Sequence, residues 1–359
     1  MSKPKRVVIM AGGTGGHIYP ALACAHRFRG IGLEVEWLGS KGGMEETLVA
    51  NHDIPVHSLS IKGVRGKGIL GLLAAPFRVL YAIGQALAVL QKVKPDVVLG
   101  MGGFVAGPGG VAARLLGIPL AIHEQNAIAG TTNTLLSKFA KVRLQAFDGA
   151  LANGVNVGNP IRDSILDQPV RETSREASRP LRLLVVGGSL GAKAINDVMP
   201  QVLASWSCSV RLDIWHQTGV RHFDDVLLDY KAANVEARVE AYLENMDQAY
   251  YWADLVLCRA GAMTVSELAI VGLPSILVPY PYAIDDHQTA NARHLESVGA
   301  AVLLPQMKLS ADTITELLSR FADNKETLLK MGESAKLVAR PNATHDVVAH
   351  CLRLINHDK

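Results

Sequence analysis

The feature that most constrains the fold is a pattern of strand and glycine loop that occurs twice in the chain. Residues 6–16 read RVVIMAGGTGG, and residues 182–191 read RLLVVGGSLG. In both copies an apolar run long enough for one strand leads directly into clustered glycines. Strands that are apolar throughout belong to parallel sheets covered on both faces, and a glycine loop of this kind opens the first βα unit of Rossmann-like domains. The repeat therefore predicts two Rossmann-like domains rather than one large sheet.

Apolar runs alternate with helical patterns through both halves of the 359-residue chain. Alternation of this kind indicates βαβ units and a doubly wound α/β fold. We expect strands at residues 6–11, 34–38, 96–100, 119–123 and 141–145 with helices at 18–30 and 105–116, and further strands at 181–186, 210–216, 254–258, 274–278 and 301–304.

The two expected domains comprise residues 1–160 and 161–342. The polar segment 168–180 between them has the composition of a linker. The sequence also predicts a helix at 343–356, which packs on either the second domain or the first. Open α/β sheets bind ligands beyond the carboxyl ends of their strands. We expect two parallel-sheet domains that face each other across a cleft, an arrangement that suits a reaction between two substrates.

The composition gives no indication of a metal, a redox centre or a nucleic-acid partner. The four cysteines are far apart and lack CxxC spacing, which favours a reducing cytoplasm. No DxD or HExxH motif occurs, so no motif requires a metal. A net charge of +3 is too small to indicate nucleic-acid binding. We expect no metal and no other cofactor.

Two stretches have some character of a membrane segment. Residues 3–25 are basic and then apolar, but the sequence GGTGGH at 12–17 interrupts the run, which indicates a first strand and loop rather than a signal peptide. Residues 69–90 are long enough to cross a bilayer, for which about 20 residues are needed. However, a central Arg78 would cost about 3 kcal/mol on insertion. We expect a helix there that packs on the protein or lies on a surface.

The segment before and within that stretch is basic and then apolar. Such a pairing suits anionic lipid headgroups and the acyl boundary, although a solvated loop followed by a buried helix has the same pattern. The residues concerned are Lys62, Arg65, Lys67, Ile69, Leu72, Leu73 and Phe77.

Glycine clusters at residues 12–16, 100–110 and 187–191 each follow a predicted strand. Backbone amides and a helix N-terminus in such a loop can hold a phosphate. The sequence lacks GxxxxGK[ST], and neither of the paired loops fits GxGxxG with an acidic residue ending the next strand, so a P-loop and an NAD site are both disfavoured. Without a metal, the amides at 189–191 or 262–264 are candidates for stabilising a departing diphosphate.

A few polar side chains follow these loops. His17 comes directly after the first glycine cluster and is either a general base or a structural residue; Glu124 or a water is the alternative base. Glu267, one turn into the helix after residue 261, either holds a ribose diol or merely favours the helix N-terminus. The cluster at 285–288, with Asn291, either contacts sugar hydroxyls or caps the next helix.

Seven segments together resemble a known family. They read AGGTGGHIYPALA, KGVRGKG, DVVLGMGGFVAGPGGVAA, HEQNAIAGTTN, VGNPIR, VVGGSLGAKAIN and AGAMTVSELAIVGLPSILVPYP, and they span essentially the whole chain. In this order they resemble the bacterial undecaprenyldiphospho-muramoylpentapeptide N-acetylglucosaminyltransferases. The resemblance implies a GT-B fold and transfer of N-acetylglucosamine from UDP-GlcNAc to lipid I, which gives lipid II, at the inner face of the cytoplasmic membrane.

The resemblance also implies roles for particular residues. Ser189 and the turn at 262–264 would meet the diphosphate, Glu267 the ribose, and Arg162 with Leu243 the uracil. Gln288 and Asn126 would contact N-acetylglucosamine, and the loop at 14–16 would face the reaction centre and the acceptor pyrophosphate. The full donor set is Thr14, Gly15, Gly16, Asn126, Arg162, Ser189, Leu243, Ala262, Met263, Thr264, Val265, Ser266, Glu267 and Gln288, and the acceptor side adds Gly102, Gly103 and Phe104.

The mechanism implied by the resemblance is a single inverting displacement with His17 as general base and no metal. Leu190 and Phe104 stand where Gln and Tyr are frequent in the motifs, which puts side-chain contacts at those positions in question. Three other functions share parts of the pattern: another glycosyltransferase or an epimerase acting on UDP-GlcNAc, a regulator that binds nucleotide sugars without catalysis, and a dehydrogenase. Acceptor-dependent release of UDP distinguishes the expected enzyme from another UDP-GlcNAc enzyme and from a regulator. Absence of NAD binding would exclude a dehydrogenase.

Overall fold

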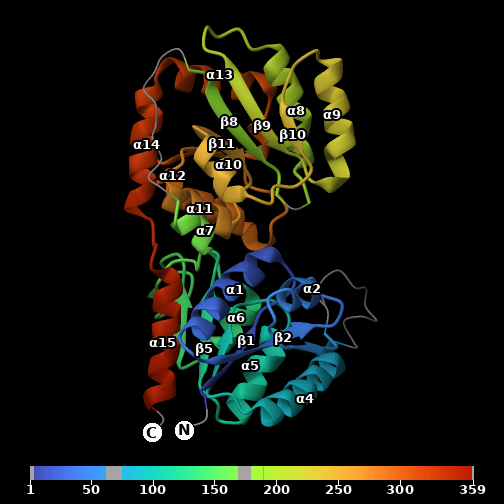
Figure 1. The fold of residues 1–359 in the computed structure, drawn as a ribbon, viewed down its shortest axis with the longest axis vertical. Helices are drawn as coiled ribbons and strands as arrows, with labels where there is room; N and C mark the ends of the chain where they lie inside the picture. Colours follow the sequence, from blue (N-terminus) through green and yellow to red (C-terminus); the bar gives the residue numbers. More distant parts are fainter. Residues whose placement is uncertain (1–3, 62–74, 169–178, 189, 358–359) are drawn as a thin grey trace. The chain divides into compact units, whose positions relative to one another are not determined.

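The computed structural model describes residues 4–61, 75–168, 179–188 and 190–357 (Figure 1). The chain forms two compact units: Met1–Arg162 together with Pro341–Lys359, and Asp163–Arg340. The first boundary lies two residues beyond the expected one, because Ile161 is buried and the Arg162 guanidinium lies 5.3 Å from the centre of the Tyr19 ring within the first unit.

The first unit is a parallel sheet with helices on both faces. Within the described residues its strand order is β3-β2-β1-β4-β5-β6-β7, and every pairing is parallel. The strands are β1 (Arg6–Met10), β2 (Glu34–Ser40), β3 (Val56–Leu59), β4 (Val97–Gly100), β5 (Leu120–Glu124), β6 (Val142–Gln145) and β7 (Val155–Asn156). The helices are α1 (Gly15–Gly30), α2 (Glu45–Ala50), α4 (Ala75–Val93), α5 (Ala106–Leu115), α6 (Thr131–Leu136) and α15 (Ala343–His357).

The second unit repeats the order of the first. Its described strands run β10-β9-β8-β11-β12-β13, again all parallel. The strands are β8 (Leu181–Val186), β9 (Leu212–Gln217), β10 (Arg238–Glu240), β11 (Leu255–Cys258), β12 (Ser275–Leu277) and β13 (Ala301–Leu303). The helices are α7 (Asp163–Leu166), α8 (Lys193–Ala204), α9 (Phe223–Ala232), α10 (Met246–Trp252), α11 (Ala262–Val271), α12 (His287–Glu296), α13 (Ala311–Asp323) and α14 (Lys325–Leu337), with short 3₁₀ turns at Val220–His222, Ile284–Asp286 and Gln306–Lys308.

The first strand shows why its sequence is apolar without alternation. Val7 and Ile9 belong to the core beneath α1 and α15, whereas Val8 and Met10 belong to the core beneath α4 and α5. Successive side chains of a strand point to opposite faces, so a strand covered on both faces needs apolar residues at every position. Each fully buried side chain of this size contributes about 1.5–3 kcal/mol to folding.

The C-terminal helix α15 covers the first unit (Figure 1). Val347, Cys351 and Ile355 are buried at four-residue spacing, in the same core as residues of α1. Spacing of four places these side chains on one face of a helix, which is the face that the core buries.

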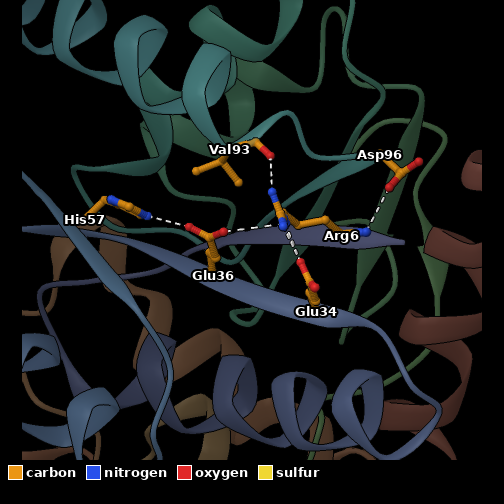
Figure 2. Close-up of polar contacts among 6 residues, drawn as sticks. All are labelled: Arg6, Glu34, Glu36, His57, Val93 and Asp96. Carbon is orange, nitrogen blue, oxygen red and sulfur yellow. Dashed lines mark hydrogen bonds and ion pairs between the residues drawn. The ribbon is translucent and has the colours of Figure 1, made fainter. Parts of the chain in front are cut away.

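Charged residues gather at the amino ends of the first strands. Arg6 donates to the Glu34 carboxylate and, at 2.6 Å, to the Val93 carbonyl, while its backbone N–H donates to Asp96 at 2.8 Å. The network drawn in Figure 2 consists of Arg6, Glu34, Glu36, His57, Val93 and Asp96. It ties β1, β2, β3 and the segment before β4 together at the edge of the sheet opposite to the glycine loops, which is a structural role.

Three short strands were not predicted. These are β3, β7 and β10, whose sequences VHSL, VN and RVE are polar or very short. They lie at the outer edges of the two sheets, where only one neighbour pairs with a strand and burial is incomplete. Helix α1 also begins at Gly15 rather than at the expected residue 18, because the Thr14 carbonyl already accepts from the N–H groups of His17 and Ile18.

Candidate active site

The glycine loops lie where the strand order reverses in each sheet. In the first unit the chain runs outward from β1 to β3 and then crosses to β4 on the other side of β1; in the second unit it does the same around β8 and β11. Open α/β sheets bind ligands at this switch point, beyond the carboxyl ends of the strands. The loops after β1, β4, β8 and β11 are therefore candidate ligand loops, and most of the predicted residues that the structure describes lie in these loops or in the helices that follow them.

His17 lies in the first turn of α1 with one ring nitrogen fixed. Its Nδ1 is 3.2 Å from the Gly12 carbonyl oxygen and 3.4 Å from the Thr14 hydroxyl. A carbonyl can only accept, so Nδ1 carries the proton of the neutral ring and donates it to Gly12. Nε2 then holds the lone pair, as a general base requires.

Gly102 and Gly103 bring the loop after β4 against the loop after β1. A Cβ at Gly102 would lie 2.8 Å from Cδ2 and 3.0 Å from Nε2 of His17, and its φ of +96° is in the left-handed region. A Cβ at Gly103 would overlap the Gly12 carbonyl. Only glycine at these two positions lets the loop after β4 pack directly against the His17 ring and the Gly12 carbonyl.

A buried carboxylate supports the first glycine loop. Glu45 is fully buried and accepts hydrogen bonds from the Ser40 N–H at 2.7 Å, from the Ser40 hydroxyl at 2.5 Å and from the Gly13 N–H at 3.3 Å. A side chain at Gly12 would overlap the same carboxylate. Glu45 therefore holds the part of the loop that supplies the acceptor for His17.

The HEQN segment after β5 consists of groups that hold each other. Glu124 is 2% exposed and accepts from the Asn126 N–H at 3.0 Å, the Gly130 N–H at 3.1 Å and Asn133 Nδ2 at 2.9 Å. Burial lowers the pKa of His123 to about 4, and its Nε2–H donates to the Gly158 carbonyl at 2.8 Å. These bonds hold the Glu124 carboxylate and the buried His123 ring in fixed orientations.

The loop after β8 is held from below by an amide. Gln217 accepts from the Gly188 N–H at 3.0 Å and donates to the carbonyls of Gly188 at 3.1 Å and Ala241 at 3.0 Å. Gly191 has a φ of +78°, and a Cβ there would overlap the Thr218 carbonyl. This close approach fixes the turn into α8.

The start of α11 offers backbone donors. Gly261 is its N-cap, with extended backbone, and the N–H of Val265 is the first to bond back, at 2.9 Å to the Gly261 carbonyl. The helix itself does not use the amides of Met263 and Thr264. Val265 is fully buried, so its side chain packs in the core and offers no polar group to a ligand.

Three side chains brace the turns around α11. Arg259 donates to the Val278 carbonyl at 3.1 Å and to Gln306 Oε1 at 2.7 Å, and the buried Asn291 donates to the Ala260 carbonyl at 3.2 Å. Gln288 Oε1 accepts from the Tyr280 N–H at 2.9 Å, which fixes the orientation of its amide. Burial, reinforced by the charge of Glu267, raises the pKa of Cys258 to about 12 and keeps it a thiol.

Leu243 lies beside a cavity of about 530 Å³ beyond β10. The cavity is also lined by Trp215, Phe223, Arg238, Glu240 and Tyr242. Arg238 stacks on Trp215 at 3.5 Å, and the Trp215 Nε1–H donates to Glu240 at 3.1 Å. Aromatic faces beside charged groups suit a flat polar ligand.

Helix α4 packs on the protein with one face and exposes apolar side chains on the other. Ala82, Ala86 and Leu90 are fully buried against the sheet. On the exposed side lie Phe77, Leu80 and Tyr81, which are 76%, 64% and 62% exposed; we call these three residues the α4 apolar patch. Of these, only Phe77 was predicted. None of the helices in the described part of the chain has the length and hydropathy of a membrane span.

The structure brings the predicted residues together in two groups. In the first unit, Thr14, Gly15, Gly16, His17, Gly102, Gly103, Phe104 and Asn126 follow the adjacent strands β1, β4 and β5, and Arg162 ends the first of the unit's two segments. In the second unit, Ala262, Met263, Thr264, Ser266, Glu267 and Gln288 lie on α11 and α12, and Leu243 follows β10. Lys62, Arg65, Lys67, Ile69, Leu72, Leu73 and Ser189 lie outside the described residues. Where the chain is described, no group of three or more His, Cys, Asp or Glu could hold a metal ion.

The residues that sequence reasoning missed are buried and polar. Glu45 and Gln217 each stand near a strand or loop of the site and are at most 3% exposed. Gln125 belongs to the HEQN segment of the sequence motifs; it donates to His123 Nδ1 at 3.0 Å, and its own Oε1 has no hydrogen-bond partner among the described residues. For Gln217 the available signal was a polar residue at the buried end of a strand, whereas Glu45 begins α2 and gave no such signal.

Known proteins match this chain along its length. The model of the glycosyltransferase family 28 N-terminal domain matches residues 7–144, and that of the family 28 C-terminal domain matches residues 182–347. The UDP-N-acetylglucosamine--N-acetylmuramyl-(pentapeptide) pyrophosphoryl-undecaprenol N-acetylglucosamine transferase of Shewanella amazonensis is 50% identical and covers 98% of both chains. That of Marinobacter nauticus is 47% identical and covers 99% of both chains.

A solved structure agrees with these relatives. The crystal structure of Acinetobacter baumannii MurG is 41% identical, with a TM-score of 0.83 over 98% of this chain and 100% of that chain. Both the resemblance stated from the sequence motifs and the predicted class, GT-B with two parallel-sheet domains, are confirmed. The chain belongs to glycosyltransferase family 28 and, within it, to the UDP-N-acetylglucosamine--N-acetylmuramyl-(pentapeptide) pyrophosphoryl-undecaprenol N-acetylglucosamine transferases.

Proposed function

We propose that this enzyme transfers N-acetylglucosamine from UDP-GlcNAc to the C4 hydroxyl of the muramoyl unit of undecaprenyl-pyrophosphoryl-MurNAc-pentapeptide, with inversion at the sugar C1. The identity of the two substrates rests on the family. The reaction type rests on one observation: the Gly12 carbonyl fixes the Nδ1 proton of His17 and leaves Nε2 as a base.

His17 takes the proton of the attacking hydroxyl on Nε2. As the ring becomes positively charged, its Nδ1–H bond to Gly12 strengthens, because a charged donor makes a stronger hydrogen bond. The hydroxyl oxygen attacks C1 of the donor sugar, and the bond from C1 to the diphosphate oxygen breaks on the opposite face. The sugar therefore changes from the α to the β configuration in one step.

The second unit holds the donor and stabilises the leaving UDP. The amides of Met263 and Thr264 lie in the first turn of α11, at the positive end of the helix dipole, and donate to the diphosphate. Glu267 accepts hydrogen bonds from the ribose diol, and the backbone of Leu243 borders the uracil. Gln288 and, from the first unit, Asn126 contact the N-acetylglucosamine. Arg162, also from the first unit, borders the uracil.

The first unit holds the acceptor and meets the membrane surface. The loop at residues 14–16 binds the acceptor pyrophosphate through its amides. The α4 apolar patch inserts at the acyl boundary, and the basic residues 62, 65 and 67 attract anionic headgroups. The enzyme is thus peripheral, at the cytoplasmic face of the membrane.

Release of UDP from UDP-GlcNAc tests this function directly. We expect release only when a short-chain lipid I analogue is present, with a β-1,4-linked product. His17→Ala should lower turnover by about 10²–10⁴-fold, the usual cost of losing a proton acceptor, with UDP affinity near normal. Tight binding of UDP-GlcNAc without acceptor-dependent release would refute the proposal, and strict dependence on Mg²⁺ would refute the metal-free departure of UDP.

A further inference from the structure

Glu267 is a carboxylate with little access to water. It lies in α11, is 7% exposed, and stands close enough to Cys258 for its charge to act on that thiol. A buried carboxylate needs hydrogen-bond donors, because removing its charge from water is otherwise costly. A carboxylate that must hold two adjacent ribose hydroxyls also needs a fixed orientation, since both oxygens have to face the diol together.

Tyr250 supplies one such donor from a neighbouring helix. It lies in α10, its side chain is fully buried, and its hydroxyl donates to Glu267 Oε2 at 2.9 Å. Hydrogen bonds to a charged acceptor are about twice as strong as neutral ones. A tyrosine ring has only two rotatable side-chain bonds and is here held on all sides by the core, so its hydroxyl is a rigid anchor.

We propose that Tyr250 is a positioning residue for the donor, which holds the Glu267 carboxylate in the orientation that binds the ribose of a uridine nucleotide. The inference rests on the proposed contact between Glu267 and the ribose. A carboxylate has about four acceptor positions. The bond from Tyr250 occupies one on Oε2 and restricts rotation of the group, so the diol meets an oriented pair of oxygens rather than a mobile one.

The ratio of two affinities separates positioning from a structural role. Calorimetry would measure the binding of UDP and of 2′-deoxy-UDP to the full-length wild type, to Tyr250→Phe and to Glu267→Gln. We expect the wild type to bind 2′-deoxy-UDP about 10- to 100-fold more weakly than UDP, as is typical for one hydrogen bond to a charged group. Tyr250→Phe should reduce this ratio to about threefold or less, by weakening UDP and leaving 2′-deoxy-UDP almost unchanged.

Tyr251 provides a matched control. It is the next residue of the same helix, is 43% exposed, and loses the same hydroxyl in Tyr251→Phe. This variant should keep the wild-type ratio. If Tyr250→Phe keeps the wild-type ratio, whether or not it weakens the binding of both ligands by the same factor, the inference is wrong and the hydroxyl only stabilises the fold.

The proposed function fails in a different way. A ratio near one in the wild type, or an unchanged ratio in Glu267→Gln, would show that Glu267 does not contact the ribose. In that case the donor site itself is wrong. A normal ratio in the wild type that falls in Glu267→Gln but not in Tyr250→Phe overturns the role of Tyr250 alone.

Discussion

Replacing Gly102 by alanine should displace the ring of His17, the proposed general base, without changing its chemistry. The new Cβ would lie 2.8 Å from Cδ2 of His17. Ordinary carbon contacts begin at about 3.5 Å, so the ring must withdraw by about 0.7 Å. A misplacement of about 1 Å in a reacting group costs about 10²-fold in rate. We therefore expect kcat to fall by about 10- to 100-fold, which is at most the loss expected for His17→Ala.

The substitution also has a cost in stability that must be separated from the effect on His17. Gly102 has a φ of +96°, where alanine is strained by about 1–2 kcal/mol. Gly117→Ala is a matched control, because Gly117 has a φ of +69° in the same unit and a Cβ there would meet nothing within 4 Å. Acceptor-dependent UDP release measures kcat, and thermal unfolding measures the strain that both variants share.

The combination with His17→Ala provides the sharpest check. If Gly102→Ala acts only through the His17 ring, the double variant should be no slower than His17→Ala alone. Equal kcat for Gly102→Ala and Gly117→Ala, or independent losses that multiply in the double variant, would refute the reasoning.

Three further predictions concern buried histidines, the close approach of Gly191 to the Thr218 carbonyl, and the exposed α4 apolar patch. Burial lowers the pKa of His123 from 6.5 to about 4 and that of His216 from 6.5 to about 3, so the unfolded chain binds two protons that the folded chain does not; unfolding by urea should therefore show about 4 kcal/mol less stability at pH 5 than at pH 7. Gly191→Ala should force the turn away from the Thr218 carbonyl and weaken UDP binding at least about tenfold, with about 2 kcal/mol lost in stability. Replacing Leu80 and Tyr81 by serine should weaken binding to anionic vesicles by about tenfold or more, and leave UDP binding unchanged.

Each of these has its own control. The stability due to neutral His123 and His216 is complete above about pH 6.5 and is lost as the pH falls toward 4, so a flat profile between pH 7 and 5 in the wild type would contradict it. Gly299→Ala has a similar φ of +74° with nothing within 4 Å of the Cβ, and should keep UDP affinity. Ala88→Ser lies on the exposed side of α4 and should keep vesicle binding; equal losses in this variant would argue against the α4 apolar patch.

Fully buried parts of the fold were predictable from local sequence. The central strands β1, β4, β8 and β11 are apolar at every position except Arg6 and Arg182 because helices cover both sheet faces, and that pattern is visible without coordinates. The edge strands β3, β7 and β10 were not predicted, because an edge strand is held by pairing with one neighbour, and its sequence need not be apolar.

The candidate site divides in the same way. The glycine loops, His17 and Glu267 were proposed from the sequence because their residue types follow strands in a pattern that suits ligand binding and proton transfer. Their supports were not found: Glu45 beneath the first loop, Gln217 beneath the second and Tyr250 behind Glu267. Each of these three reaches its partner across a sequence separation of 17 to 32 residues.

The sequence by itself determined that the chain forms two parallel-sheet α/β units, that glycine loops end their first strands, and which polar residues stand beside those loops. The tertiary structure decided that α15 completes the first unit, and that Gly102 packs on the His17 ring. It also decided that Nδ1 of His17 lies within hydrogen-bond distance of the Gly12 carbonyl. The physical reason is range: strand and loop patterns follow from burial and backbone conformation a few residues at a time, whereas the orientation of a catalytic side chain depends on atoms that only folding brings within hydrogen-bond distance.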